Sequence, residues 1–160
     1  MKATNLPLWS KGVIGVLIAG GSAFALFKLY QYFGKLKEQQ GQQAELDTTK
    51  EEIKTLTASG KKSTLTKPQI DQIANKLQTA FAGYGTDYNA IVNALVQVKN
   101  DIDLLSVRSA YGIRKISSGS YNIAKDFEGT LDQAMIEELS STDIQKINLI
   151  LARKGIMNRF

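Results

Sequence analysis

Apolar residues are concentrated near the start of the chain, where residues 12–27 read GVIGVLIAGGSAFALF without a charge. The run continues to Phe33 with Lys28 as the single charge in it. A membrane-spanning helix needs about 20 predominantly apolar residues, and a lysine near its end can extend its ammonium to the headgroups. The pattern therefore predicts a single transmembrane helix over residues 12–33, preceded by a short segment of residues 1–11.

Aromatic residues flank this run, with Trp9 before it and Tyr30 and Tyr32 within its far end. Such residues are enriched at both membrane interfaces, which favours an anchor over a buried core helix. A cleaved signal peptide is the other alternative, because residues 23–25 read Ala-Phe-Ala, a small-x-small cleavage pattern. The sequence retains Met1, so we expect an uncleaved, permanent anchor.

Small residues recur along the predicted transmembrane helix and would allow a second helix to approach closely. They are Gly12, Gly15, Ala19 and Ala23. This stripe indicates helix packing within the membrane, including homo-oligomerisation, although glycine and alanine are also common in membrane helices that do not pair. Lysines lie on both sides of the run, so the orientation in the membrane stays open.

Residues 34–65 are polar and rich in Gln, Glu and Lys, and we expect them to form a polar, partly helical linker. Four of these residues are spaced as in a coiled-coil seam, namely Leu46, Thr49, Ile53 and Leu56. A solvated helix is the alternative interpretation, because fewer than two heptads support the seam. Residues 58–63 are small or polar and indicate a flexible joint, where we place the domain boundary.

From residue 66 to residue 156, apolar residues recur at the three- and four-residue spacing of short amphipathic helices. Helix-capping residues divide this segment into five helices. The predicted caps are Thr66, Thr86 or Asp87, Asn100, Thr130, and one of Ser140, Ser141 and Thr142. Residues 112–126 predict a long loop, and no strand-like alternation is found. The predicted fold is all-α, with a transmembrane helix and a compact five-helix domain.

Charge and residue types narrow the function classes. The net charge is +5, but charges of both signs are interspersed over the C-terminal domain, so we expect no nucleic-acid partner. The chain has no Cys and no His, which excludes disulfides, thiolate chemistry and the usual zinc ligands. No nucleophile elbow, phosphate-binding Walker loop or HExxH pattern is present, and we do not expect an enzyme.

Weaker candidates for function lie in the loop and at the helix starts of this domain. Arg114 and Lys115 fall in the predicted loop, where they would either meet phosphate headgroups or be solvated. Asp101 and Asp103 follow the turn before the third helix, and we expect them to act as cap residues.

The motifs of this domain occur in a characteristic order. Residues 81–87 read FAGYGTD and precede a helical NAIVNALVQV, while residues 130–151 read TLDQAMIEELSSTDIQKINLIL. This order, over about residues 67–152, resembles a single annexin repeat, whose first helix is followed by a GxGTD loop. The resemblance implies an annexin-like five-helix fold.

In annexins the GxGT loop binds Ca²⁺ through backbone carbonyls, and an acidic residue further along supplies a carboxylate. The resemblance implies such a site here, formed by the carbonyls of Phe81, Gly83 and Gly85 with the carboxylate of Glu138. The chain departs from the family in its inserted loop and in having one repeat where annexins usually have four. A helix end followed by a new cap is the alternative interpretation of the loop. We expect no other cofactor.

These observations favour a structural role over catalysis. We expect a membrane-anchored adaptor that tethers a helical module to a bilayer within a larger assembly. Its partners would be the bilayer and other protein subunits, either the capsid shell of a virion with an internal membrane or a bacterial membrane complex in which the chain is an accessory subunit. A calcium-dependent membrane- or lipid-binding module is the alternative that the annexin resemblance implies.

Overall fold

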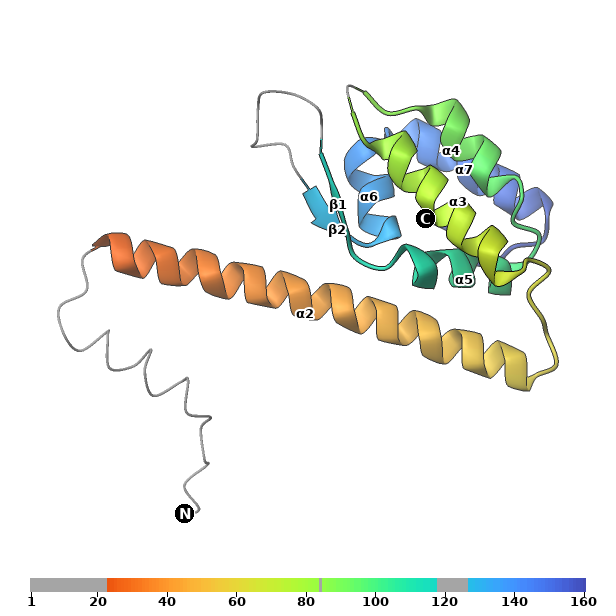
Figure 1. The fold of residues 1–160 in the computed structure, drawn as a ribbon, viewed down its shortest axis with the longest axis horizontal. Helices are drawn as coiled ribbons and strands as arrows, with labels where there is room; N and C mark the ends of the chain where they lie inside the picture. Colours follow the sequence, from red (N-terminus) through yellow and green to blue (C-terminus); the bar gives the residue numbers. More distant parts are fainter. Residues whose placement is uncertain (1–22, 84, 118–126) are drawn as a thin grey trace, which may run out of the picture. The chain divides into compact units, whose positions relative to one another are not determined.

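The computed structural model describes residues 23–83, 85–117 and 127–160 (Figure 1). The chain divides into two compact units, Met1–Gly41 and Gln42–Phe160, which are described separately. In the first unit the described residues belong to helix α2 (Ala23–Ala58), on which the rings of Tyr32 and Phe33 are exposed and meet edge to face at 6.2 Å.

The first half of the predicted transmembrane segment, residues 12–22, lies outside the described residues, and residues 23–33 belong to α2. Among the helices of the described part, none combines the length and the apolar character that crossing a membrane requires. The transmembrane helix therefore stays a prediction of the sequence.

Helix α2 is longer than the partly helical linker that the sequence predicts. It continues to Ala58, and its residues from Gln42 onward belong to the second unit. Within this unit the side chains of Leu46 and Thr49 are only 8% and 7% exposed. The stripe that resembles a coiled-coil seam is thus a packing face of the chain itself, and the compact unit begins before the boundary that we placed at residues 58–63.

Five further helices follow, which confirms the mainly helical fold class for the described residues. They are α3 (Lys67–Phe81), α4 (Tyr88–Leu95), α5 (Asp101–Tyr111), α6 (Leu131–Glu138) and α7 (Ser141–Arg153). Four of the five predicted caps accept hydrogen bonds: the side-chain oxygens of Asp87, Asn100, Thr130 and Ser140 accept from amides in the first turns of α4, α5, α6 and α7. Each cap satisfies an amide that the helix leaves without a partner.

Helix α3 is the centre of the core and packs against both α4 and α5 (Figure 1). Its inward face is apolar at helical spacing, and the residues on it are fully buried: Ile73, Ala74, Leu77, Ala80 and Phe81. In α6 the apolar residues do not all face the core, since Ile136 is 65% exposed.

The segment 112–126 is not simply a long loop, and the expectation that the chain lacks strands is wrong. Strand β1 (Arg114–Ile116) pairs with β2 (Phe127–Gly129) in an antiparallel ladder, and Ile116 is buried in the core. Three residues are too few to display the two-residue alternation by which a strand is recognised in a sequence. Residues 118–126, between the strands, lie outside the described residues.

The joint between α2 and α3 is fastened by Asp103, a residue of α5 that is completely buried. Its Oδ1 accepts from Ser63 Oγ and Thr64 N, both at 2.7 Å, and its Oδ2 accepts from Thr64 Oγ1 at 2.7 Å and Lys99 N at 3.0 Å. Burial raises the pKa of Asp103, but these hydrogen bonds outweigh it and hold the pKa below its usual value. Asp103 is therefore more than the cap residue that the sequence predicts.

We expect Asp103→Asn to lower the free energy of unfolding by about 2–4 kcal/mol at pH 7, because an amide cannot accept from all these donors. The loss should shrink as the pH falls through the lowered folded-state pKa of Asp103, since the wild-type carboxylate then becomes protonated too. Urea denaturation measures the effect. Asp71→Asn is the control, because Asp71 only forms an exposed ion pair with Lys67 and should change stability by about 0.5 kcal/mol or less. Equal losses in the two variants would contradict this assignment.

Candidate functional site

The structure brings together the loop and the acidic residue of the predicted calcium site. The Thr86 hydroxyl donates a 2.8 Å hydrogen bond to Oε2 of Glu138, although 52 positions separate the two residues. Gly83 and Gly85 have positive φ angles of 102° and 87°, a conformation that glycine adopts without steric cost. The adjacency depends on α6, whose last residue is Glu138.

The described backbone hydrogen bonds around this loop do not involve the predicted carbonyl ligands. The loop is closed by Asp87 N, which donates to Ala80 O at 2.9 Å, and by Gly83 N, which donates to Ser117 O at 3.0 Å. Among the described residues, no hydrogen bond uses the carbonyl oxygens of Phe81, Gly83 and Gly85. No three Asp or Glu side chains in the described part of the chain are grouped as metal ligands, so a cation here would depend on these carbonyls.

A buried hydroxyl lies close to this site. Tyr111 is 2% exposed, and within the described residues its OH has no hydrogen-bond partner. Burial, together with the negative charge of Glu138 and against the positive charge of Arg114, raises the pKa of Tyr111 to about 12. The ring itself packs edge to face on Phe81 at 6.4 Å, so its main role is in the core.

The residues predicted to pack helices in the membrane cannot be placed. Gly12, Gly15 and Ala19 lie outside the described residues, and Ala23 is the first residue of α2. The stripe therefore stays a prediction.

Arg114 is neither a solvated loop residue nor free to hold a phosphate. Its guanidinium donates to Tyr111 O at 2.7 Å, to Asn75 Oδ1 at 2.9 Å and to Gln78 Oε1 at 2.8 Å. The guanidinium also lies 5.0 Å from the centre of the Tyr111 ring. Arg114 thus joins the ends of α3 and α5 to strand β1, which is a structural role.

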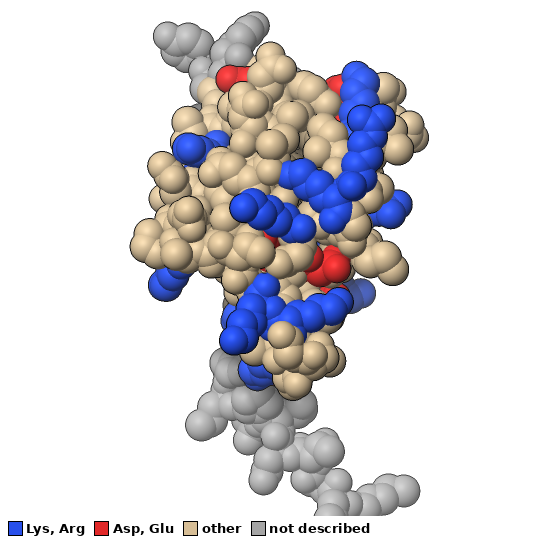
Figure 2. Space-filling view, turned by 90° about the vertical axis from the view of Figure 1, so that its right-hand side faces the viewer, with Lys and Arg blue, Asp and Glu red and all other residues tan. Residues whose placement is uncertain are grey.

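Lys and Arg side chains gather on one face of the molecule, with few Asp or Glu among them (Figure 2). In the sequence the charges are interspersed, because cations that the fold brings together belong to segments far apart in the chain. Hydrogen bonds from Asn100 and to Asp101 join three such segments.

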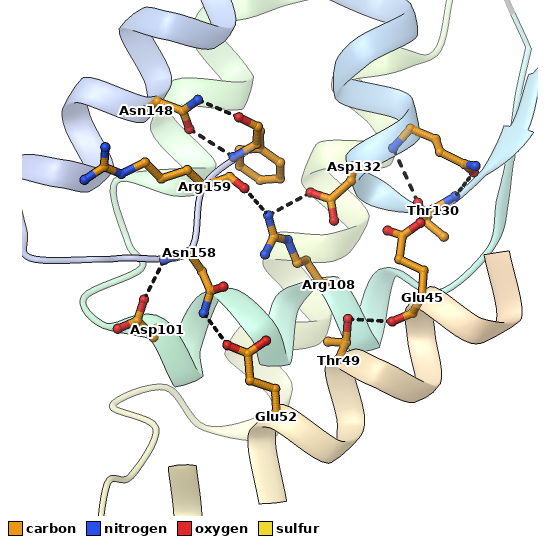
Figure 3. A network of polar contacts seen from close by, with 12 residues as sticks. Glu45, Thr49, Glu52, Asp101, Arg108, Thr130, Asp132, Asn148, Asn158 and Arg159 are labelled. Atoms are coloured by element: carbon orange, nitrogen blue, oxygen red, sulfur yellow. Dashed lines mark hydrogen bonds and ion pairs between the residues drawn. The ribbon is translucent and has the colours of Figure 1, made fainter. Parts of the chain in front are cut away.

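A second polar cluster, which the sequence analysis missed, surrounds the buried guanidinium of Arg108 on α5 (Figure 3). Arg108 is 9% exposed, and its Nη2 lies 2.8 Å from Asp132 Oδ1 of α6 and 2.9 Å from the carbonyl oxygen of Arg159. The ring of Phe160 covers the guanidinium at 4.8 Å. Arg108 Nε has no hydrogen-bond partner among the described residues, and the contact with Asp132 is an ion pair without the alignment of a hydrogen bond.

Glu45 of α2 brings a second carboxyl group to Asp132. Burial raises the pKa of Asp132, the charge of Arg108 lowers it, and the hydrogen bond and charge of Glu45 raise it again, to about 6. The negative charge of Glu45 favours the protonated form of Asp132, because ionised Asp132 would repel it.

Further contacts fasten α2 and the C-terminal segment to the same cluster. Gln42 Nε2 donates to Glu128 O at 2.9 Å, and Asn158 Nδ2 donates to Glu52 Oε1 at 3.0 Å. The side chain of Asn148 forms two hydrogen bonds with the backbone of Phe160, at 2.6 and 3.0 Å (Figure 3). The cluster therefore connects α2, α5, α6, α7 and the last residues of the chain.

Comparison with known proteins gives no match to a family model, to a curated protein or to a solved structure. The annexin resemblance therefore rests on the motifs of this sequence.

The Asp132 pair gives the protein a specific pH dependence. The folded state keeps a proton up to about pH 6 that the unfolded chain loses near pH 4, so this group destabilises the folded protein as the pH rises from 4 to 6. We expect Glu45→Gln to weaken this dependence, because it removes the second carboxylate and lowers the folded-state pKa of Asp132.

Urea denaturation at pH 4.5 and pH 7 measures this effect. The variant should gain on the order of 1 kcal/mol relative to wild type at pH 7 and less at pH 4.5. Glu51→Gln is the control, because Glu51 is exposed and its carboxylate contacts only Lys54. If both variants change the pH dependence alike, the assignment of the Asp132 pair is wrong.

Proposed function

We propose that the chain is a non-enzymatic, membrane-anchored structural adaptor, which tethers a helical interaction module to a bilayer within a larger assembly such as a virion with a lipid membrane. The observation that carries this proposal is the attachment of α2. The helix begins within the apolar run, and its part from Gln42 to Ala58 is hydrogen-bonded to strand β2 and to the C-terminal segment of the second unit. A membrane anchor at the start of the chain would therefore hold the folded module itself, and not a loose tail.

The surroundings of the apolar run support the membrane part of the proposal. Tyr32 and Phe33, at the far end of the run, are 54% and 52% exposed on α2. Exposed aromatic rings at the end of an apolar segment match the preference of such rings for the headgroup region.

The contacts of the described ionisable groups support the non-enzymatic part of the proposal. Three described groups with shifted pKa values, Asp103, Tyr111 and Asp132, are engaged in packing or in contacts between helices. Catalytic groups with such shifts usually face a cleft in which a substrate can bind.

The double substitution Leu17→Lys/Ile18→Lys tests the anchor. Each lysine in the middle of a spanning helix costs about 3 kcal/mol of insertion free energy, so we expect the variant to leave the membrane fraction on alkaline carbonate washing, while the wild type remains in it. Thr57→Lys/Ser59→Lys, at the exposed end of α2, is the control and should stay in the membrane fraction. A wild-type protein that washes off, or a variant that stays, would remove the basis of the proposal.

Calcium-dependent binding is the second candidate function, and the contact between Thr86 and Glu138 favours it. The carboxylate stands beside a loop with two glycines, and the carbonyls of Phe81, Gly83 and Gly85 are free of other described hydrogen bonds. These are oxygen ligands of the kind that Ca²⁺ prefers. The Thr86 hydroxyl would keep the Glu138 carboxylate oriented toward the loop.

A calcium titration followed by thermal unfolding tests the second candidate. With a dissociation constant of about 1 mM, 10 mM Ca²⁺ should add about 1.4 kcal/mol to the free energy of unfolding, whereas Mg²⁺ should add less. Glu138→Gln should abolish the gain. Glu137→Gln, which alters the exposed neighbouring residue, should retain it. No stabilisation of the wild type by Ca²⁺, or an equal gain in Glu138→Gln, would rule out this function.

A further inference from the structure

Figure 2 shows a face of the molecule on which Lys and Arg side chains gather. Three segments of the second unit that hydrogen bonds join carry five cations, which we call the basic surface: Lys61, Lys62, Lys99, Lys154 and Arg159. All are exposed except Lys154, which is half-buried.

Hydrogen bonds hold these segments side by side. Asn100 Nδ2 donates to Lys62 O at 3.1 Å, which joins the segment after α2 to the turn before α5. Asp101 Oδ1 accepts from the amides of Met157 and Asn158, at 2.7 and 2.9 Å, which joins this turn to the C-terminal segment. The basic surface is therefore built on fixed backbone.

Lys154 is held by backbone carbonyls and interacts with a second cation, Lys99. Its Nζ donates to Val98 O at 2.9 Å and to Val96 O, near the end of α4. The contact with Val98 O places this ammonium group beside Lys99, the next residue in the chain. Burial lowers the pKa of Lys154, and the positive charge of Lys99 lowers it further. Like charges that the fold brings together repel one another, and an anionic partner would relieve that repulsion.

Within the described residues, no carboxylate forms an ion pair with any of the five cations of the basic surface. The nearby carboxylate of Asp101 is already used by two backbone amides.

An apolar side chain stands among these cations. Met157 is 80% exposed, more than any other large apolar residue in the described part of the chain. Methionine is enriched in protein interfaces, where a flexible apolar side chain adapts to its partner and charged residues form the rim.

The basic surface lies far from the point at which the chain enters the second unit. The unit begins at Gln42, which is bonded to Glu128, whereas the surface begins just after Ala58. Helix α2 rises about 24 Å between Gln42 and Ala58. A tether that enters at one end of the unit leaves the other end free for a partner.

We infer that the basic surface is the partner-binding surface of the adaptor. It binds an acidic segment of another protein, with Met157 at the centre of the contact. The inference rests on the proposed function, because it names the kind of partner that the tethered module holds. A protein partner fits better than a nucleic acid, since no exposed aromatic ring for base stacking has been found among these residues.

Fluorescence of the full-length chain in detergent tests the inference. The chain has no cysteine, so Met157→Cys can carry a single environment-sensitive dye. The probe is a short synthetic peptide in which Glu alternates with Leu. We expect saturable binding with a blue shift of the dye, and weaker binding as salt is raised.

Charge reversal gives the matched comparison. Lys61→Glu/Lys62→Glu should weaken peptide binding by about 10-fold or more, while Lys35→Glu/Lys37→Glu, with the same change in net charge on exposed residues of α2, should weaken it by less than about 2-fold. The salt dependence of the wild type remains informative if a variant proves unstable. Equal weakening by the two variants, or no blue shift with the wild type, would overturn the inference.

Two further probes separate the alternative partners. Tighter binding of duplex DNA than of the peptide would assign the surface to nucleic acid. A blue shift only with anionic vesicles would assign it to lipid. Either result would overturn the inference. The peptide assay needs no membrane insertion. Peptide binding by a protein that washes off membranes would therefore support the inference and contradict the membrane anchor. Retention in the membrane without peptide binding would support the anchor and contradict the inference.

Discussion

The arrangement of the Gln42–Phe160 unit depends on the interactions of the buried Arg108 guanidinium. Arginine cannot release its charge, so burial requires a permanent set of acceptors around it. Asp132 supplies the negative charge, the carbonyl oxygen of Arg159 supplies an acceptor, and the ring of Phe160 covers the planar face. Removing one partner from a buried pair of this kind typically costs 3–5 kcal/mol. The interaction thus commits α5, α6 and the last residues of the chain to one arrangement.

The same cluster makes α2 part of the domain. Gln42 donates to Glu128 O of β2, Glu52 accepts from Asn158, and Leu46 is buried on the helix between them. A helix held only by a flexible joint would transmit nothing to the domain. A helix hydrogen-bonded to the domain at both ends of this stretch holds whatever the start of the chain is attached to, and this is the physical basis for the adaptor proposal.

Much of the helical fold was predictable from the sequence, because caps and apolar spacing are local signals. Asp87, Asn100, Thr130 and Ser140 cap the helices at the predicted places. Strands β1 and β2 were missed because three residues are too short for a pattern. The packing of α2 was missed because a Leu-x-x-Thr stripe gives no sign of whether its partner lies in the same chain.

The polar sites were predictable only in part. The GxGTD motif and Glu138 were named from a family resemblance, and the contact between Thr86 and Glu138 places them together. The cluster around Arg108 was missed, although Arg108 interrupts the apolar face of its helix, which is a usable signal for a buried ion pair. The basic surface was also missed, because its residues converge only through the contacts of Asn100 and Asp101 with distant segments.

If α2 from Gln42 to Ala58 is an integral part of the folded domain, its amides exchange only when the domain unfolds. Amide hydrogen exchange of the full-length chain measures this, since exchange by global unfolding gives every core amide the same protection. We expect amides around Leu46 and Thr49 to be protected nearly as strongly as those of α5. Exchange of these amides at the rate of an isolated, solvated helix, while α5 stays protected, would contradict it.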